Sequence, residues 1–94
     1  GAGDPRRCRM SAAAFLEKVA GVLEERGHAY GAADAAFEAI AARWSITLGR
    51  PVSAAQVVLC MIDLKLVRLT HDQGHEDSLI DVIGYAALFP EVCR

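Results

Sequence analysis

The chain has 94 residues, of which 53% are hydrophobic and 23% are charged. This composition is typical of a single globular domain and excludes an intrinsically disordered chain. The formal net charge is −2 at pH 7, whereas a DNA-binding domain of this size is usually basic, so direct DNA binding is not expected. The sequence contains no apolar run of about 18 residues and no signal peptide, so we expect a soluble cytoplasmic protein that does not associate with membranes.

Residues 1–10 are interpreted as a cloning remnant without ordered structure, because Gly1 to Pro5 resembles one and Met10-Ser11 resembles a natural start. Residues 11–94 are then a single helical domain. A chain this short buries a modest core, so we expect a homo-oligomer. Cys60 lies in an apolar run and is predicted to be a small buried residue.

Two helices are predicted in the first half of the domain from apolar residues spaced three and four apart. The first helix is capped by Ser11 and runs to about Arg26. Gly27 is expected to end it, and residues 28–31 are expected to form a turn. The second covers about 32–48 and is ended by Gly49.

The third helix has the clearest predicted start. Ser53 and Gln56 have the spacing of a capping box, and Val52 and Val57 have that of a hydrophobic staple. From there to Leu69 the sequence is apolar on nearly every side of a helix, which predicts a central element.

A polar connection over 70–76, with Gly74 as its hinge, leads to a fourth helix that begins near Asp77. We expect it to continue to Phe89 and to stop at Pro90. No strand pattern is present and the connections are short. The predicted fold is therefore all-α, a compact four-helix arrangement of antiparallel helices with the third helix central.

Charged residues interrupt the two apolar helices at the end of the chain, where burial is costly unless the charges are paired or used. Asp63, Asp77 and Asp81 are candidate ligands for Mg²⁺ or Mn²⁺, and Lys65 and Arg68 are candidate phosphate-binding residues. The structural alternative is that Asp63 pairs with a cation, Asp77 caps its helix and Asp81 bonds to backbone or to Arg68.

Three further residues are candidate ligand contacts: Tyr30, His75 and Tyr85. Tyr30 precedes a glycine in a turn, and Tyr85 shares a helical face with Asp77 and Asp81. His75 can instead satisfy hydrogen bonds of the turn. Gly84 would leave a notch beside the carboxylates, because glycine in mid-helix costs about 1 kcal/mol and usually has a packing or ligand reason.

Two segments resemble one family of small proteins. They are Lys65-Leu66-Val67-Arg68-Leu69 and the run from His75 to Leu88, HEDSLIDVIGYAAL. Together with Tyr30-Gly31, Phe37 and Trp44 they resemble the phage and prophage proteins described as a domain of unknown function, DUF6378. Ala36 departs from that pattern, where a polar residue is expected. The resemblance implies a phage or prophage gene product in the cytoplasm of a bacterial host cell.

A more distant likeness is to nucleotide-modification-associated and MazG-like all-α domains. Asp81-Val82-Ile83-Gly84-Tyr85 looks like the second metal-binding helix of MazG-like nucleotide pyrophosphohydrolases. Ser78 stands where that element has a glutamate, and the paired glutamates of the first element are missing. If the protein is an enzyme of this kind, its signature is incomplete.

Three functions follow from these observations. The first is nucleotide handling, by metal-assisted binding or hydrolysis in phage DNA metabolism or modification. The second is a non-catalytic, anti-CRISPR-like counter-defence inhibitor that binds a host defence protein, with exposed acids such as Glu24 and Glu25 in place of phosphates. The third is a structural homo-oligomer in which the charged residues set the register of the helices.

Overall fold

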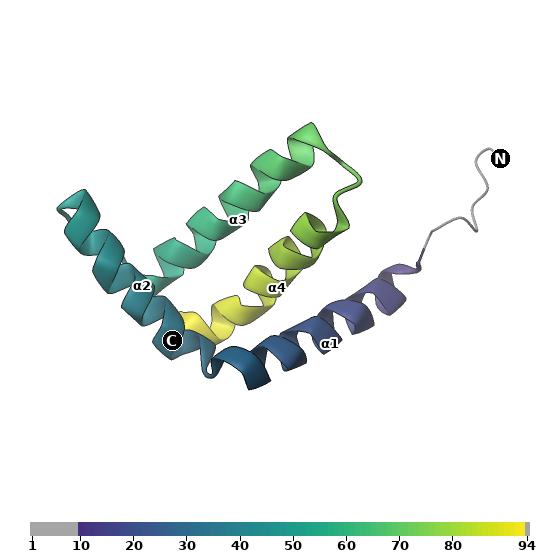
Figure 1. Ribbon diagram of the computed structural model, residues 1–94, viewed down its shortest axis with the longest axis horizontal. Helices are drawn as coiled ribbons and strands as arrows, with labels where there is room; N and C mark the ends of the chain where they lie inside the picture. Colours follow the sequence, from purple (N-terminus) through teal and green to yellow (C-terminus); the bar gives the residue numbers. More distant parts are fainter. Residues whose placement is uncertain (1–9, 94) are drawn as a thin grey trace.

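The computed structural model describes residues 10–93, apart from the side chain of Tyr30. Four helices and no strand are found in this part of the chain (Figure 1). They are α1 (Ala12–Tyr30), α2 (Ala33–Leu48), α3 (Ala54–His71) and α4 (Glu76–Val92). The all-α prediction is confirmed. None of these helices combines the length and the hydropathy needed to cross a membrane. The interpretation of residues 1–9 lies outside the described part of the chain.

The helices are arranged around the hairpin of α3 and α4 (Figure 1). α4 lies between α3 and α1, and α2 crosses the hairpin near the N-terminal end of α3 and the C-terminal end of α4. α3 packs against both α4 and α2, so the prediction that it is central is confirmed. α1 packs mainly on α4.

The buried core lies where α2 crosses the hairpin. Its buried members come from α2, α3 and α4: Phe37, Ala41, Ala54, Val57, Val58 and Val92. Small residues at Ala41 and Ala54 let the helices approach closely, and Val57 and Val58 have no exposed surface. The main hydrophobic cluster therefore lies at one end of the hairpin, and outside it the buried apolar residues of the described chain are Val19 of α1 and Ile80 of α4.

The turn between α2 and α3 follows the sequence prediction. Gly49 ends α2 in a left-handed conformation with φ of 70°. The side chain of Ser53 accepts a hydrogen bond from the Gln56 amide, and the Gln56 side chain accepts one from the Ser53 amide, so the capping box is confirmed. Ser45 adds a contact that the sequence did not indicate: its Oγ accepts a hydrogen bond from the Val52 amide at 2.8 Å.

Two predicted helix ends are wrong. α1 continues one turn past Gly27 to Tyr30 and ends at Gly31, which has φ of 83°. Gly27 is tolerated within the helix, because the cost of a glycine there is only about 1 kcal/mol. Pro90 lies inside α4, which continues to Val92. A proline in the last turn removes one hydrogen bond, and the burial of Val92 in the core offsets that loss.

Candidate functional site

Asp81, in the middle of α4, joins three helices through its carboxylate. Its Oδ1 accepts a hydrogen bond from the guanidinium of Arg26 in α1 at 2.9 Å. Its Oδ2 pairs with the ammonium of Lys65 in α3 at 3.0 Å. The side chains of Asp81 and Lys65 are only 13% and 15% exposed, so this pair is largely removed from water. Burying Asp81 or Lys65 alone would be costly, and their pairing between the helices compensates the two opposite charges.

The pKa of Asp81 is lowered from its ordinary value. Burial acts most strongly and by itself would raise the pKa, because it penalises the charged form. The hydrogen bonds from Lys65 and Arg26, and the positive charges of both groups, together outweigh burial. Asp81 is therefore a carboxylate at neutral pH.

We predict that Asp81→Asn destabilises the fold by roughly 1.5–3 kcal/mol, the range for hydrogen bonds to charged groups, since Lys65 would lose its counter-charge. Because the pKa of Asp81 is lower in the folded than in the unfolded state, its contribution is complete well above pH 4 and is lost as the pH falls through the folded pKa. Urea unfolding of wild type and Asp81→Asn at several pH values measures this contribution. The difference in the free energy of unfolding between the two proteins should be largest at neutral pH and should shrink below about pH 4.

Asp63→Asn is the matched control for this experiment. Asp63 is exposed, and no ion pair joins it to another of the described residues. Its replacement should change stability by less than about 0.5 kcal/mol. Equal effects of the two substitutions would contradict a structural role that is specific to Asp81.

A cleft of about 720 Å³ lies beside Asp81, between α1, α2 and α4. Apolar and aromatic side chains form much of its wall, and Tyr85 meets Phe37 edge to face with ring centroids 6.0 Å apart. Its ionisable residues are Glu24, Arg26, Asp81, Tyr85 and Glu91. The size is that of a small-molecule site, but its carboxylates outnumber its one arginine.

Gly84 gives α1 room to lie close to α4. A Cβ built on Gly84 would lie 3.5 Å from Cδ2 of Leu23, so the notch expected from the sequence is occupied at that point by a side chain of α1. This is a packing reason for a glycine in the middle of a helix.

We predict that Gly84→Ala stabilises the protein by about 0.5–1 kcal/mol. The added methyl group would make an ordinary van der Waals contact with Leu23, and alanine has the higher helix propensity. Thermal or urea unfolding measures the change. Gly84→Leu is the contrasting variant and should destabilise the fold, because a larger side chain must displace α1. A destabilising Gly84→Ala would contradict this account of the α1–α4 contact.

Of the three predicted metal ligands, Asp77 and Asp81 lie one turn apart on α4, whereas Asp63 belongs to α3. Asp77 is exposed in the first turn of α4, where its charge favours the helix N-terminus. Asp63 is exposed on α3, about 160° around the helix from Lys65, which faces Asp81. No group of three or more His, Cys, Asp or Glu residues that could share a metal ion was found in the described part of the chain. The Mg²⁺ or Mn²⁺ site stays a prediction.

The two predicted phosphate-binding residues also separate. Lys65 points inward and pairs with Asp81, whereas Arg68 is exposed on the outer side of α3. His75 caps α4: its Nδ1 accepts a hydrogen bond from the Ser78 amide at 3.2 Å and lies 2.7 Å from the Ser78 hydroxyl. Tyr85 lines the cleft, and the side chain of Tyr30 lies outside the described residues.

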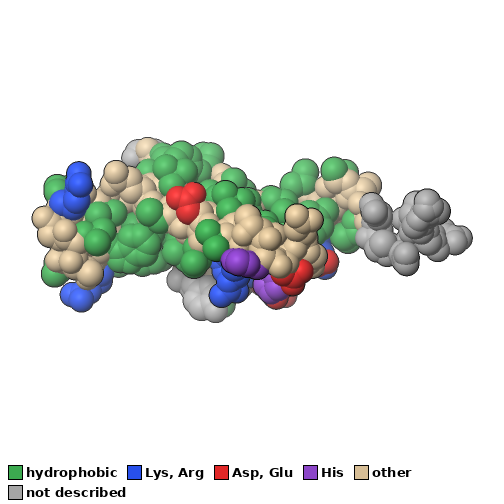
Figure 2. All heavy atoms as spheres, turned by 90° about the horizontal axis from the view of Figure 1, so that it is seen from above, with side chains coloured by type: hydrophobic (Ala, Val, Ile, Leu, Met, Phe, Trp, Pro, Cys, Tyr) green, Lys and Arg blue, Asp and Glu red, His purple; other side chains and the backbone are tan. Residues whose placement is uncertain are grey.

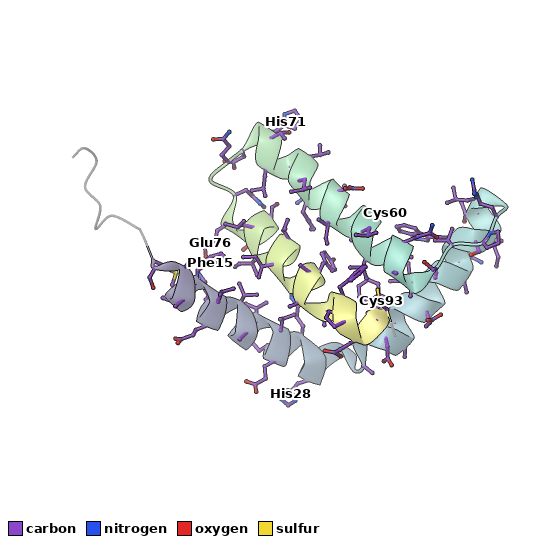
Figure 3. All side chains as sticks on the ribbon, turned by 180° about the vertical axis from the view of Figure 1, so that it is seen from behind. Phe15, His28, Cys60, His71, Glu76 and Cys93 are labelled. Carbon is purple, nitrogen blue, oxygen red and sulfur yellow. The ribbon has the colours of Figure 1, made fainter. Side chains whose placement is uncertain are left out.

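Sequence reasoning missed the contributions of α1 to this site. The sequence indicates Arg26 only as the end of a helix, yet in the structure it pairs with Asp81, which is 55 positions away. Lys18 forms a second link between α1 and α4 by pairing with Glu76, which lies beside the N-terminal half of α1 (Figure 3). No local pattern indicates either pair, because both depend on how α1 lies on α4.

A different surface has a strong hydrophobic character. We call it the outer face of α3 and define it by its exposed residues: Leu59, Cys60, Asp63, Leu64, Leu66, Val67, Arg68, Thr70 and His71. Leu59, Leu64, Leu66 and Val67 are 51%, 49%, 46% and 56% exposed, respectively. Cys60 is exposed as well, so its predicted burial is wrong (Figure 3).

Apolar surface continues from this face onto α2. A shallow hollow is lined by Trp44, Leu48 and Pro51 together with Leu59 and Cys60 of α3. Figure 2 looks onto this side of the molecule and shows hydrophobic side chains covering much of the surface over α2 and α3. Exposed apolar residues scattered singly need no explanation, but a continuous patch of this kind is characteristic of an interaction site.

The fold defines a small all-α protein of four helices built on the α3–α4 hairpin. The chain belongs to the family described as a domain of unknown function, DUF6378, whose model matches residues 14–93. No curated protein and no solved structure gave a match to the chain.

Proposed function

We propose that the protein works by binding another protein chain through the outer face of α3. The observation that carries this proposal is the exposure of four large apolar side chains, Leu59, Leu64, Leu66 and Val67, on the central helix of the fold. Burying such side chains contributes roughly 1.5–3 kcal/mol each, so covering this face would be strongly favourable.

The charged residues support the same proposal. Lys65, Arg26 and Asp81 form a closed structural link between helices. Arg68 and Asp63, in contrast, are exposed on α3, with no ion pair to other described residues. By helical geometry Asp63 lies among the exposed apolar side chains and Arg68 at their edge. A largely apolar surface that carries few charged groups agrees with the composition of a protein–protein interface.

We predict that Val67→Glu abolishes capture of the partner, because a charge at the centre of the interface would have to be buried unpaired. The measurement is affinity capture with the tagged full-length chain, in cells that also express an untagged copy, followed by mass spectrometry. Leu16→Glu is the matched control: Leu16 is similarly exposed, at 55%, but lies on α1. Capture that survives Val67→Glu, or is lost equally in both variants, would contradict the proposal.

The counter-defence function is one form of this proposal, in which the captured chain is a host defence protein. Glu24 and Glu25 are exposed on α1, as phosphate mimicry would require. Reversing both charges tests that contribution separately from the α3 face, because the two surfaces belong to different helices.

Nucleotide binding is the second candidate, favoured by the cleft beside Asp81. The cleft combines an aromatic side chain, Tyr85, with the half-exposed guanidinium of Arg26, which pairs with Asp81 through Nη1. A base could pack on the ring while the guanidinium met a phosphate. Because the carboxylates of Glu24, Asp81 and Glu91 also line the cleft, a polyphosphate would need a divalent cation.

If this second function holds, isothermal titration with ATP or a deoxynucleoside triphosphate should show binding that depends on Mg²⁺. Arg26→Gln should weaken it by about tenfold or more, since the phosphate would lose its charged donor. Glu25→Gln, at the neighbouring exposed position, is the control and should leave affinity nearly unchanged. Absence of binding at millimolar nucleotide with Mg²⁺ would contradict this candidate.

A further inference from the structure

We infer that α1 is a hinged arm: it leaves α4 as a unit while α2, α3 and α4 stay folded, and by leaving it opens the cleft beside Asp81. This inference goes beyond both candidate functions and depends on neither of them. The deciding observation is that no described residue of α1 belongs to the main hydrophobic cluster or to the apolar side chains packed against it. The apolar contacts that join the other three helices are therefore made without α1.

The buried part of the contact between α1 and α4 is small. Figure 1 shows the two helices side by side and running in the same direction, with α1 away from α3. In the described part of α1 only Val19 is buried, and the half-buried Leu23 lies against Gly84 of α4. Ile80 precedes Gly84 by one turn, as Val19 precedes Leu23, so the same register brings the two buried residues together. For a helix of 19 residues this is a limited apolar attachment.

Two ion pairs flank this apolar contact. Lys18 pairs with Glu76, and Arg26 pairs with Asp81. The side chains of Lys18, Glu76 and Arg26 are 43%, 51% and 49% exposed, respectively. Ion pairs with this much exposure contribute little to stability, and dissolved salt screens them. The attachment of α1 is therefore expected to weaken as the salt concentration rises.

The carboxylate of Asp81 keeps a counter-charge when α1 leaves. Removing one partner of a buried ion pair is usually strongly destabilising, because it leaves a buried charge unpaired. Here Oδ2 of Asp81 stays paired with the ammonium of Lys65 in α3, at 3.0 Å, after Arg26 has moved into water. The half-exposed guanidinium of Arg26 loses little hydration in the closed state and regains it in the open one. The link between α3 and α4 is thus independent of α1.

A hinge of two residues, Gly31 and Ala32, joins α1 to α2. Gly31 has φ of 83° and ψ of −155°, a conformation that is open to glycine and strained for other residues. A Cβ built on Gly31 would meet no described atom beyond its chain neighbours within 4 Å, so the space around the hinge is open. Ala32, at the start of α2, makes no side-chain capping hydrogen bond that would have to break. A few such residues at the ends of elements are sufficient to absorb a rotation of the arm.

The cleft is the part of the molecule that this rotation opens. α1 supplies one of its walls, which includes Leu23, Arg26 and Gly27. Tyr85 and Leu88 of α4 belong to the facing wall. Rotation about the hinge moves the first wall away from the second, because α2 and α4 are held by the main hydrophobic cluster. α1 is therefore a lid on the cleft, and the two ion pairs keep it closed.

Hydrogen–deuterium exchange of the full chain, measured by mass spectrometry, tests this motion. A detached helix of 19 residues is marginally stable in water, so its amides exchange whenever α1 leaves α4. Raising the NaCl concentration from about 10 mM to about 1 M shortens the Debye length from about 30 Å to about 3 Å. Exchange of residues 18–26 should then become about threefold faster or more, whereas exchange of residues 54–71 in α3 should change by less than about twofold.

The double variant Lys18→Gln/Arg26→Gln removes both ion pairs, and circular dichroism verifies that it is folded. At low salt its residues 18–26 should exchange about fivefold faster or more than in wild type, and the salt effect should disappear. Glu25→Gln is the matched control, because Glu25 is exposed on the same helix and makes no ion pair with the described residues. Equal acceleration in all four helices would overturn the inference, since α1 would then open only by global unfolding. Acceleration confined to residues 12–17, or no acceleration, would also overturn it, because the first is fraying of a helix end.

Discussion

The arrangement of α1, α3 and α4 depends on the two ion pairs that the carboxylate of Asp81 makes with Arg26 and Lys65. The main hydrophobic cluster lies at the crossing of α2 with the hairpin, and outside it the buried apolar residues of the described chain are Val19 of α1 and Ile80 of α4. Asp81 adds a polar contact in each direction, to Lys65 in α3 and to Arg26 in α1. Because its two partners come from opposite sides of α4, a single acid sets the position of both neighbouring helices (Figure 1).

This link also determines which charges are available for function. In the sequence, Lys65 and Asp81 resemble functional-site residues, because burying a charged side chain in an apolar helix is costly unless it is paired. In the structure they pair with each other, and both side chains are largely buried between α3 and α4. The polar side chains of α3 that face outward include Asp63, Arg68 and His71, and these accompany the exposed leucines. The inner side of α3 is thus structural, and its outer side is the surface that supports an interaction.

The cleft beside Asp81 and the outer face of α3 lie on different sides of the hairpin. The cleft borders α1, α2 and α4, and the outer face belongs to α3 and extends onto α2. A ligand in the cleft would contact the α1–α4 packing at Gly84 and Leu23, whereas a partner on α3 would not. The two candidate functions therefore involve separate surfaces, and both remain compatible with one fold.

The sequence by itself determined the class of fold, the four helices and most of their ends. Helical periodicity, the Ser53 capping box and Gly49 act over a few residues, so local physics is sufficient to predict them. Pro90 and Gly27 misled that reasoning, because burial of Val92 and the intrinsic tolerance of a helix for one glycine are not visible in a local pattern. The family likeness was also contained in the sequence, and the family match confirmed it.

Only the tertiary structure decided the partners of the charged residues and the exposure of the apolar ones. Arg26 and Asp81 are 55 positions apart, and nothing local distinguishes Arg26 from any other arginine at a helix end. The apolar run of α3 predicted a central element, which is confirmed, but α4 and α2 cover only part of the helix, and Leu66, Val67 and Cys60 stay exposed. Which face of a uniformly apolar helix is covered depends on how many helices surround it, and that number is a property of the packing.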